Sequence, residues 1–262
     1  MNGDWPAIPP KRGVFITGTD TDVGKSVIAA GLTAALRSRN IQATYFKAVQ
    51  SGCQEEDGRL IAGDARLAQT MAGLAEPLAL LTPVVLKLPL APAVAAAQAG
   101  VRIDLEDIAK AYRQLAGRYD FMVVEGAGGL YVPLVDNTFL VLDLARWLGL
   151  PVVVVARAGL GTINHTVMTV KTVQQAGLPV LGIIINQYPG KPNLAALTNP
   201  EIIAEISGRP VLAKVPVIAD LARDEGKTAL IQSLGEIFQK PAWREFFGNQ
   251  NPPQPALEKG GA

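Results

Sequence analysis

The feature that most constrains this chain is a glycine-bounded polar loop between a short apolar segment and a long helical pattern. Residues 14–16 have the apolar character of a buried strand, the loop runs from Gly18 to Ser26, and an alanine- and leucine-rich pattern continues to about Arg39. A strand, a loop ending in Gly-Lys-Ser and a helix, in this order, are the context of a phosphate-binding P-loop. In such a loop the backbone N–H groups and the helix N-terminus face phosphate oxygens. We therefore expect Lys25 to reach the terminal phosphates and the Ser26 hydroxyl to bind Mg²⁺.

The composition excludes several classes of partner. The 262 residues carry a formal net charge of +1 and no basic run, which argues against nucleic acid or membrane as the main partner. Apolar runs such as 151–156 and 180–185 are far shorter than the roughly 20 residues that span a bilayer. The first twelve residues are polar and proline-rich, without the apolar segment of a secretory leader. A single cysteine forbids an internal disulfide and suits a reducing compartment, so we expect a cytoplasmic protein.

Apolar and amphipathic segments alternate along the chain, which predicts strands followed by helices. Strands are expected at residues 13–18, 43–47, 84–87, 120–125, 151–156, 180–186 and 211–216, and helices at 25–39, 62–73, 104–117, 138–148, 163–176, 200–206 and 227–238. This alternation predicts an α/β fold of the P-loop NTPase kind, with a mostly parallel sheet of about seven strands and helices on both faces. We expect a single domain over residues 13–247, a flexible N-terminal tail at 1–12 and a disordered C-terminal tail at 248–262.

Polar residues follow the predicted strands, at the edge of the sheet where open α/β proteins bind ligands. Lys47 ends the second strand beside a loop that closes at Gly52, where an ammonium could neutralise phosphate or carbamate oxygens. A plain surface lysine is the alternative at this position. Asp64 begins a helix and is either an N-cap residue or a ligand of Mg²⁺. Asp104 is expected to cap the helix that begins after it.

The strand predicted at 120–125 delivers Glu125 to its carboxyl end, where a glycine-rich run over 126–129 follows. A carboxylate at that depth needs a compensating cation, and glycines let the backbone approach a ligand closely. Mg²⁺ is the natural candidate for this cation. The alternative is a glycine-rich turn that contains an incidental glutamate.

Three further strand ends carry weaker signals. The loop at 158–166 leads into a helix whose free N–H groups could bind a carboxylate, although His165 within it has the pattern of an ordinary polar residue. Asn186 offers both a donor and an acceptor, which fits the edge of a nucleotide base. Residues 215–220 could close the same end of the sheet. Cys53 is expected to be an ordinary residue and not a nucleophile, because the only histidine is His165 and nothing nominates it as a partner.

With these motifs in order, the chain resembles the dethiobiotin synthetases, the ATP-dependent carboxylases of biotin synthesis. The resemblance runs from about residue 13 to 235, and the motifs that carry it are the loop 18–26, residues 47–52, the run 125–129, the segment 161–165 and Asn186. Five residues separate Gly18 from Gly24, one more than in the common P-loop, and this spacing is the form that the family uses.

The resemblance implies a role for each matching residue. Lys47 and Lys25 are the expected catalytic residues, and Ser26, Asp64 and Glu125 the expected Mg²⁺ ligands. The ATP contacts it implies are Asp22, Val23, Gly24, Lys25, Ser26, Val27, Asp64, Glu125, Gly126, Ala127, Gly128, Asn186, Gln187, Val215, Pro216, Val217 and Asp220, of which Asn186, Pro216 and Asp220 surround adenine. The substrate contacts are Thr21, Lys47, Ser51, Gly161, Thr162 and Asn164. The family is a homodimer, so the segment 161–164 of one subunit is expected to meet the substrate carboxylate bound by the other.

The implied reaction is the carboxylation and ring closure of 7,8-diaminononanoate with CO₂, ATP and Mg²⁺ to give dethiobiotin, ADP and phosphate. It requires little acid–base work from side chains, since phosphoryl transfer depends mainly on positioning and charge neutralisation. An enzyme with one histidine can therefore perform it.

Three positions depart from the family pattern, and two other classes of protein compete with it. Ala48 replaces a usual proline after Lys47, Ala91-Pro92-Ala93 replaces Ser-Pro-His and leaves a substrate contact open, and Ser26 replaces the commoner threonine but keeps the hydroxyl. One alternative is an amide ligase of the cobyrinic-acid type, whose extra glutaminase region the residues after 190 are too few to supply. The other is a ParA-like ATPase switch, which has a signature lysine where this chain has Asp20.

Overall fold

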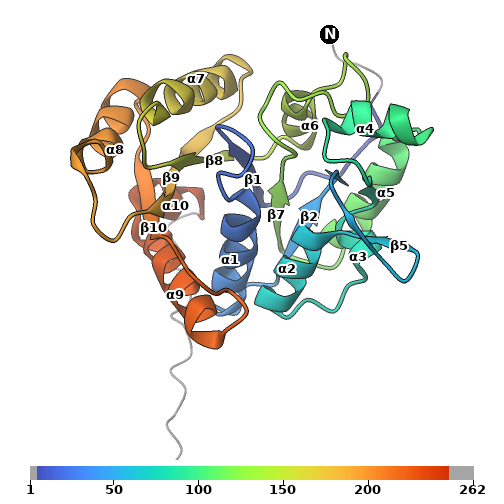
Figure 1. Ribbon diagram of the computed structural model, residues 1–262, viewed down its shortest axis with the longest axis horizontal. Helices are drawn as coiled ribbons and strands as arrows, with labels where there is room; N and C mark the ends of the chain where they lie inside the picture. Colours follow the sequence, from blue (N-terminus) through green and yellow to red (C-terminus); the bar gives the residue numbers. More distant parts are fainter. Residues whose placement is uncertain (1–4, 248–262) are drawn as a thin grey trace, which may run out of the picture.

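Six parallel strands form the central sheet of the protein, whose computed structural model describes residues 5–247 (Figure 1). The sheet has the order β10-β9-β8-β1-β7-β2. Its strands are β1 (Gly13–Gly18), β2 (Ala43–Lys47), β7 (Phe121–Glu125), β8 (Val152–Arg157), β9 (Val180–Tyr188) and β10 (Val211–Pro216). Every residue of β1, β2 and β7 is buried, as expected for a parallel sheet covered on both faces. All strands therefore point their carboxyl ends to one edge, where a site can form.

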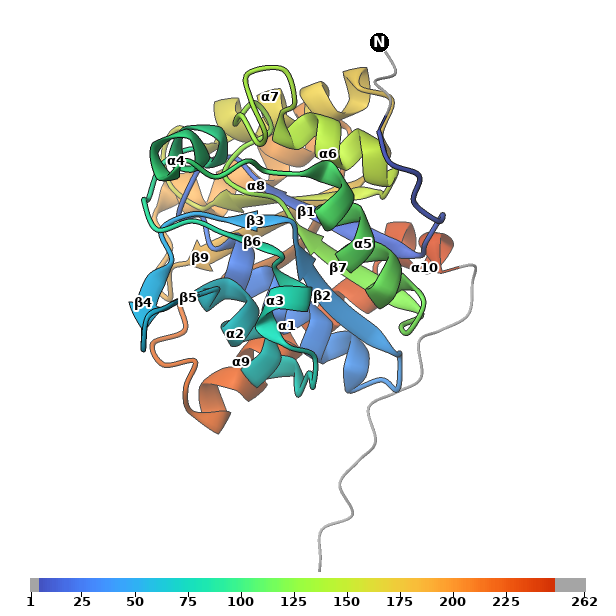
Figure 2. The same ribbon diagram turned by 90° about the vertical axis from the view of Figure 1, so that its right-hand side faces the viewer.

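Helices cover both faces of the sheet, and Figure 2 shows α6, α7 and α8 on one side and α1, α2 and α9 on the other. The helices that the sequence predicts are α1 (Lys25–Arg37), α2 (Gly63–Ala72), α5 (Leu105–Ala116), α6 (Val141–Leu148), α7 (Thr162–Gln175), α8 (Leu194–Ser207) and α9 (Asp224–Gly235). Asp104 caps α5 as predicted, because its carboxylate accepts a hydrogen bond from the Glu106 N–H at 2.8 Å. The α/β fold with a parallel sheet and two helical layers is confirmed.

The central sheet has one strand fewer than predicted. The segment expected as a strand at 84–87 forms only β6 (Val84–Val85), which pairs with β3 (Val49–Gln50) in a separate two-stranded sheet. One edge strand of the central sheet is therefore β2, and the small sheet lies in the connection that follows it.

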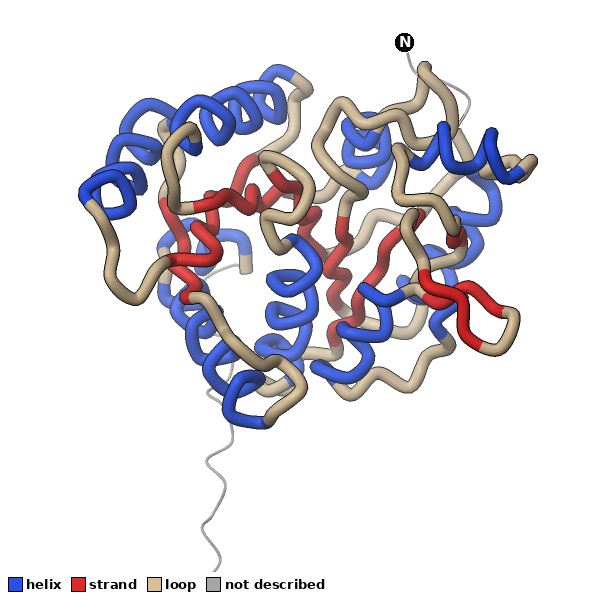
Figure 3. The backbone as a smooth tube through the Cα atoms, in the orientation of Figure 1, coloured by secondary structure: helices blue, strands red, loops and turns tan. Residues whose placement is uncertain are grey.

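Several short elements have no counterpart in the sequence prediction. They are the antiparallel hairpin of β4 (Gln54–Glu56) and β5 (Arg59–Ile61), visible at the edge of the molecule in Figure 3, together with α3 (Leu78–Leu81), α4 (Pro92–Ala99) and α10 (Pro241–Phe246). The helix predicted at 227–238 ends as the 3₁₀ helix η1 (Glu236–Gln239). The hairpin turn consists of Asp57 and Gly58, both with positive φ, which is the type I′ chemistry that tight hairpins prefer. This Asp-Gly pair was the available signal for the hairpin.

Helix α8 begins at Leu194, six residues earlier than predicted, and runs through Pro200. A proline inside a helix removes the hydrogen bond to the carbonyl four residues earlier. Here that carbonyl belongs to Ala196, and it accepts a hydrogen bond from the Tyr188 hydroxyl at 3.1 Å. A side chain thus supplies the donor that the proline lacks.

Residues before β1 contact the domain. The Trp5 ring packs edge-on against Phe139 with 5.4 Å between centroids, and the Trp147 indole N–H donates to the Pro6 carbonyl at 2.8 Å. The division into a domain at 13–247 and two tails stays a prediction, and residues 248–262 lie outside the described part of the chain. Among the described residues, no helix has the length and apolar character needed to cross a membrane.

Candidate active site

The P-loop connects β1 to α1, as the sequence predicts, with α1 beginning at Lys25. Two of its residues adopt left-handed backbone, Asp22 with φ 57° and Gly24 with φ 90°. A Cβ atom on Gly24 would lie 2.0 Å from Nδ2 of Asn186, so only glycine fits here. Asn186, buried in β9, donates from that Nδ2 to the Val23 carbonyl at 2.8 Å. The amide of Asn186 thus holds the loop that the sequence assigns to phosphate binding.

Lys25 is buried, 6 % exposed, and its ammonium donates to the Asp20 carbonyl at 2.9 Å. Burial lowers the pKa of Lys25, and the negative charge of Glu125 only partly opposes that effect. The ammonium is within hydrogen-bond distance of a neutral carbonyl and lies at the start of a helix, where N–H groups are also free. This region suits an incoming anion such as phosphate.

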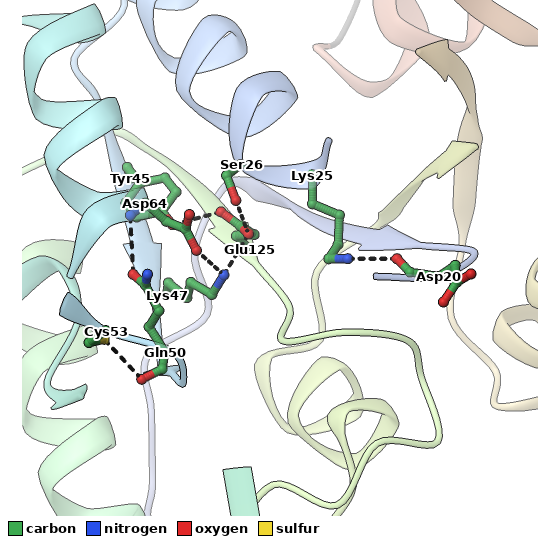
Figure 4. A network of polar contacts seen from close by, with 9 residues as sticks. All are labelled: Asp20, Lys25, Ser26, Tyr45, Lys47, Gln50, Cys53, Asp64 and Glu125. Carbon is green, nitrogen blue, oxygen red and sulfur yellow. Dashed lines mark hydrogen bonds and ion pairs between the residues drawn. The ribbon is translucent and has the colours of Figure 1, made fainter. Parts of the chain in front are cut away.

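Lys47 lies at the carboxyl end of β2, directly beside Glu125 at the end of β7, because these two residues are paired in register. Its Nζ is 2.5 Å from Oδ2 of Asp64 and 2.7 Å from Oε1 of Glu125 (Figure 4). Burial acts to lower the pKa of Lys47, but the charges of Glu125 and Asp64 and their hydrogen bonds outweigh it and raise the pKa. Lys47 is therefore a buried, charged member of the site, and the alternative of a surface lysine is wrong.

Glu125 is fully buried in its side chain and accepts hydrogen bonds on both oxygens. Oε1 accepts from Ser26 Oγ at 2.8 Å as well as from Lys47, and Oε2 accepts from the Tyr45 hydroxyl at 2.7 Å. These contacts join the P-loop, β2 and β7 at one point. A buried carboxylate is stable only with such partners.

The residues predicted to bind Mg²⁺ fit a divalent cation by their chemistry. Lys47 contacts the carboxylates of Asp64 and Glu125, and the Ser26 hydroxyl contacts the same Glu125 oxygen, so these three oxygen-bearing side chains are linked to one another. Oxygen donors of this kind are what Mg²⁺ prefers, with water completing its shell. No cluster of three or more His, Cys, Asp or Glu side chains suited to a metal exists within residues 5–247. Asp64 lies in the first turn of α2 with Ala62 as its N-cap, so the N-cap alternative for Asp64 is wrong.

The glycine run after β7 packs closely against β1 and the start of α6. The Gly126 N–H donates to the Ile16 carbonyl at 2.9 Å, and a Cβ there would lie 3.1 Å from the Phe15 ring. Gly128 has φ 69° and would place a Cβ 2.8 Å from Val132. Packing therefore favours glycine at Gly126 and requires it at Gly128, beside any contact with a ligand.

The hydrogen bonds and ion pairs of residues 5–247 do not connect the remaining predicted contacts to this cluster. Thr21 is exposed, and its N–H donates to Asp20 at 2.7 Å. At the start of α7, Thr162 is buried with its hydroxyl 3.3 Å from that of Thr166, whereas Gly161 and Asn164 are more accessible. The other residues have these positions: Ser51 is partly exposed after β3, Val217 is exposed, Val215 and Pro216 end β10, and Asp220 pairs with Arg223 at 3.1 Å. His165 is exposed on α7, and Cys53 is buried with a pKa raised by burial. That both are ordinary residues stays a prediction.

Three residues that contact the site were missed from the sequence. Tyr45 precedes Lys47 by two positions on β2, and the two-residue period of a strand puts both on one face, which was an available signal. Gln50 accepts from the Asp64 N–H at 3.1 Å, and Arg157 at the end of β8 donates to the Thr21 carbonyl at 3.1 Å. Both contacts depend on the path of loops, which carry no periodic pattern. Gln187 was predicted, and it donates to the Asp22 carbonyl at 3.3 Å.

Comparison with known proteins agrees with the geometry. Residues 12–225 match the family model described as an AAA domain. Two solved structures share the fold: a complex of Cyanothece McdA with ATP, with a TM-score of 0.50 at 12 % identity over 91 % of this chain and 97 % of that one, and the MinC:MinD cell division protein complex of Aquifex aeolicus, with 0.50 at 13 % identity over 87 % and 96 %. At these identities the likeness concerns the fold alone.

Curated relatives are much more similar in sequence. The ATP-dependent dethiobiotin synthetase of Clostridium kluyveri is 40 % identical over 85 % of this chain and 92 % of its own length. The enzymes of the same name from Anaeromyxobacter dehalogenans and Bacillus subtilis are 43 % and 38 % identical, each over 81 % of this chain and over 93 % and 90 % of their own lengths. The chain therefore belongs to the AAA-domain family and to the ATP-dependent dethiobiotin synthetases.

Proposed function

We propose that this protein is the ligase that makes dethiobiotin from 7,8-diaminononanoate, CO₂ and ATP. One amine of the diamine takes up CO₂ to form a carbamate. A carbamate oxygen attacks the γ-phosphorus of ATP and displaces ADP, which gives a mixed carbamic–phosphoric anhydride. The second amine then attacks the carbamate carbon, closes the ureido ring and releases phosphate.

The observation that carries this proposal is the position of Lys47 beside the P-loop. Its ammonium lies 2.7 Å from Glu125, and the same oxygen of Glu125 accepts from Ser26 of the P-loop. A second buried lysine next to a phosphate loop supplies positive charge where the carbamate and the transferred phosphoryl group need it. The similarity to dethiobiotin synthetases over about nine tenths of their length supports the choice of substrate.

The chain's own residues would bind and neutralise rather than exchange protons. Lys25 and the N–H groups from Asp22 to Val27 would hold the phosphates, which suits an ammonium whose pKa burial lowers. Lys47 would leave its carboxylate partners to hold the carbamate oxygens. Because transfer of a phosphoryl group depends on alignment and charge, these two lysines are the expected catalytic residues.

Mg²⁺ would be held by Ser26, Asp64 and Glu125, and it supplies positive charge on the phosphate oxygens when bound. The arrangement of Lys47 between the two carboxylates supports this assignment, since its ammonium supplies the positive charge that the metal ion would supply there. Metal binding would then free Lys47 for the substrate.

The adenine and diamine contacts are part of the same proposal. Adenine would lie among Asn186, Gln187, the end of β10 and Asp220, with Gly126 to Gly128 beside the nucleotide. The diamine would contact Thr21, Ser51 and the 161–164 segment of a second subunit. Exposed apolar side chains support a homodimer through this region: Leu160 is 98 % exposed, Met168 on α7 60 % and Leu194 on α8 76 %. Sedimentation of the purified protein at the monomer mass would contradict the dimer.

We also propose a cytoplasmic location, supported by the single cysteine.

One assay tests the reaction. Purified protein is mixed with 7,8-diaminononanoate, bicarbonate, ATP and Mg²⁺, and dethiobiotin and phosphate are measured. We expect equal amounts of the two products, and omission of the diamine serves as the control. Phosphate release without the diamine would favour an ATPase switch. Folded protein that binds ATP and yields no dethiobiotin would reject the proposal.

A further inference from the structure

Tyr45 is a buried tyrosine of β2 whose hydroxyl contacts the site. Its neighbours on the strand alternate: Phe46 points to the opposite face and packs edge-on against Tyr112 with 5.6 Å between centroids, whereas Lys47 shares the face of Tyr45. Tyr45 is fully buried, and its hydroxyl donates to Oε2 of Glu125 at 2.7 Å. The Tyr45 hydroxyl therefore reaches Glu125 from the same strand as Lys47 (Figure 4).

The two oxygens of Glu125 have different kinds of donor. Oε1 accepts from Ser26 and Lys47. In the proposed function Ser26 binds the metal and Lys47 binds the carbamate, so both change partners when nucleotide and substrate bind. Oε2 accepts from Tyr45, which is enclosed in the core and makes no contact with the phosphate loop among the hydrogen bonds of residues 5–247. When Ser26 and Lys47 exchange partners, Tyr45 is the donor that can stay in place.

We propose that Tyr45 is a positioning residue that holds Oε2 of Glu125, so that Oε1 faces the divalent cation beside Ser26. The proposal rests on the proposed function only in taking Glu125 as a ligand of that cation. Carboxylates that bind metals are in turn fixed by hydrogen bonds from outside the metal shell, and these outer partners set metal affinity. A carboxylate free to rotate would lose part of its affinity, because its orientation would have to be fixed at each binding event.

The phenol is suited to a permanent donor role. Burial, together with the charge of Glu125, raises the pKa of Tyr45 well above its usual range, so the hydroxyl keeps its proton at neutral pH. Phenylalanine would fill the same space without the hydroxyl. The substitution Tyr45→Phe therefore removes the hydrogen bond with little change in packing.

The test is the Mg²⁺ dependence of ATP binding. It is measured by isothermal titration calorimetry on the full chain at a series of Mg²⁺ concentrations. For Tyr45→Phe we expect the Mg²⁺ concentration that gives half of the maximal effect to rise about 10- to 100-fold. The affinity for ATP without metal should stay unchanged, since the substitution leaves the phosphate loop as it is.

Tyr112→Phe is the matched control. Tyr112 is also a fully buried tyrosine, but its hydroxyl has no hydrogen-bond partner in the described part of the chain. Its loss should leave the Mg²⁺ dependence unchanged. A Tyr45→Phe protein that folds, melts at a lower temperature and keeps the wild-type Mg²⁺ dependence would overturn the proposal, because that result describes a purely structural tyrosine.

A measurement on the unmodified protein covers the case in which Tyr45→Phe fails to fold. With tyrosine labelled at its ζ carbon, NMR should detect a slowly exchanging hydroxyl proton that persists when Mg²⁺ and ATP are added. Loss of that proton on metal binding would overturn the proposal. Neither experiment contains the diamine. The role of Tyr45 is therefore tested independently of whether the protein makes dethiobiotin.

Discussion

Lys25 and Lys47 are equally buried, each 6 % exposed, yet the protein provides them with opposite surroundings. Lys25 in the P-loop donates to a backbone carbonyl, and burial lowers its pKa. Lys47 at the end of β2 contacts two carboxylates, which raise its pKa despite burial. The free protein thus supplies the counter-charge for one lysine and leaves the other to be neutralised by a ligand.

This difference suggests how the two regions divide their work. A lysine that lacks a carboxylate partner gains most from an incoming phosphate, because the anion removes the penalty of burying a charge. A lysine that already has two partners must exchange them, which links its release to the arrival of a cation at the same carboxylates. Binding of metal and nucleotide would therefore prepare Lys47, while Lys25 is prepared in the free protein.

The largest effect should come from Lys47→Met, which keeps the length of the side chain and removes its charge. We expect turnover to fall at least about 10²- to 10³-fold, since charge on the reacting oxygens is lost. The free energy of unfolding without ligands should fall by about 3 kcal/mol, because Glu125 and Asp64 lose the charge between them. Product formation and urea unfolding measure the two effects. A variant as stable as the wild type would show that the carboxylates do not need Lys47.

Added Mg²⁺ sharpens this prediction. If the cation takes the place of the ammonium, it should recover part of the stability of Lys47→Met and stabilise the wild type less. The control is the same titration on Lys25→Met, whose carboxylate cluster is intact. Equal stabilisation of the Lys47 and Lys25 variants would contradict the exchange of partners at Glu125 and Asp64.

A smaller effect is expected from Gly24→Ala, which strains the P-loop without changing any charge. The substitution combines a backbone φ of 90° with a Cβ 2.0 Å from Nδ2 of Asn186. Strain of this kind costs about 1–3 kcal/mol, or roughly a 5- to 150-fold loss of ATP affinity if the loop moves to relieve it. Calorimetry of ATP binding is the measurement.

Two variants separate the causes of that loss. Gly177→Ala has a similar φ of 78° but nothing within 4 Å of its Cβ, so it should leave ATP affinity unchanged. The double variant Gly24→Ala/Asn186→Ala removes the clash and also the hydrogen bond to Val23. If Gly24→Ala binds ATP with the affinity of the wild type, the conformation of the loop does not determine the affinity for the phosphates.

The sequence predicts the frame of this site well, because the frame follows regular periods. Strands β1 and β2 and the first residue of α1 lie where the sequence places them, and these elements position Lys25, Ser26 and Lys47. The meeting of Lys47 with Glu125 follows from parallel pairing of β2 with β7, which brings two strand ends together. The family resemblance added the roles of these residues, and the curated relatives confirm the family.

The contacts that depend on irregular segments could not be predicted in the same way. Asp64 reaches Lys47 only because residues 48–62 form β3, a hairpin and a turn that bring the start of α2 back over β2. The segment 84–87 has the pattern of one more buried strand, but it pairs with β3 and leaves the central sheet at six. Short apolar runs indicate a strand without indicating its partner. Tyr45 is different, since the two-residue period places it beside Lys47 and a buried hydroxyl needs a partner.

The smallest effect is expected from Lys25→Met in the absence of nucleotide. The change in the free energy of unfolding should not have the sign expected for Lys47→Met. Loss of a buried ammonium without a carboxylate partner should be neutral or stabilise by about 1 kcal/mol. The folded-state pKa of Lys25 is lowered, so its buried ammonium destabilises the folded protein by the full amount below that pKa. This destabilisation disappears as the pH rises to the pKa of lysine in the unfolded chain, about 10.4. For Lys47, whose folded-state pKa is raised, the stabilisation is complete below about 10.4 and lost only above it. Urea unfolding at pH about 7 and about 10 should therefore show the gap between wild type and Lys25→Met closing, while the gap for Lys47→Met persists. A Lys25→Met protein destabilised as strongly as Lys47→Met would mean that the P-loop lysine is also compensated from within, and the two regions would not differ as their contacts indicate.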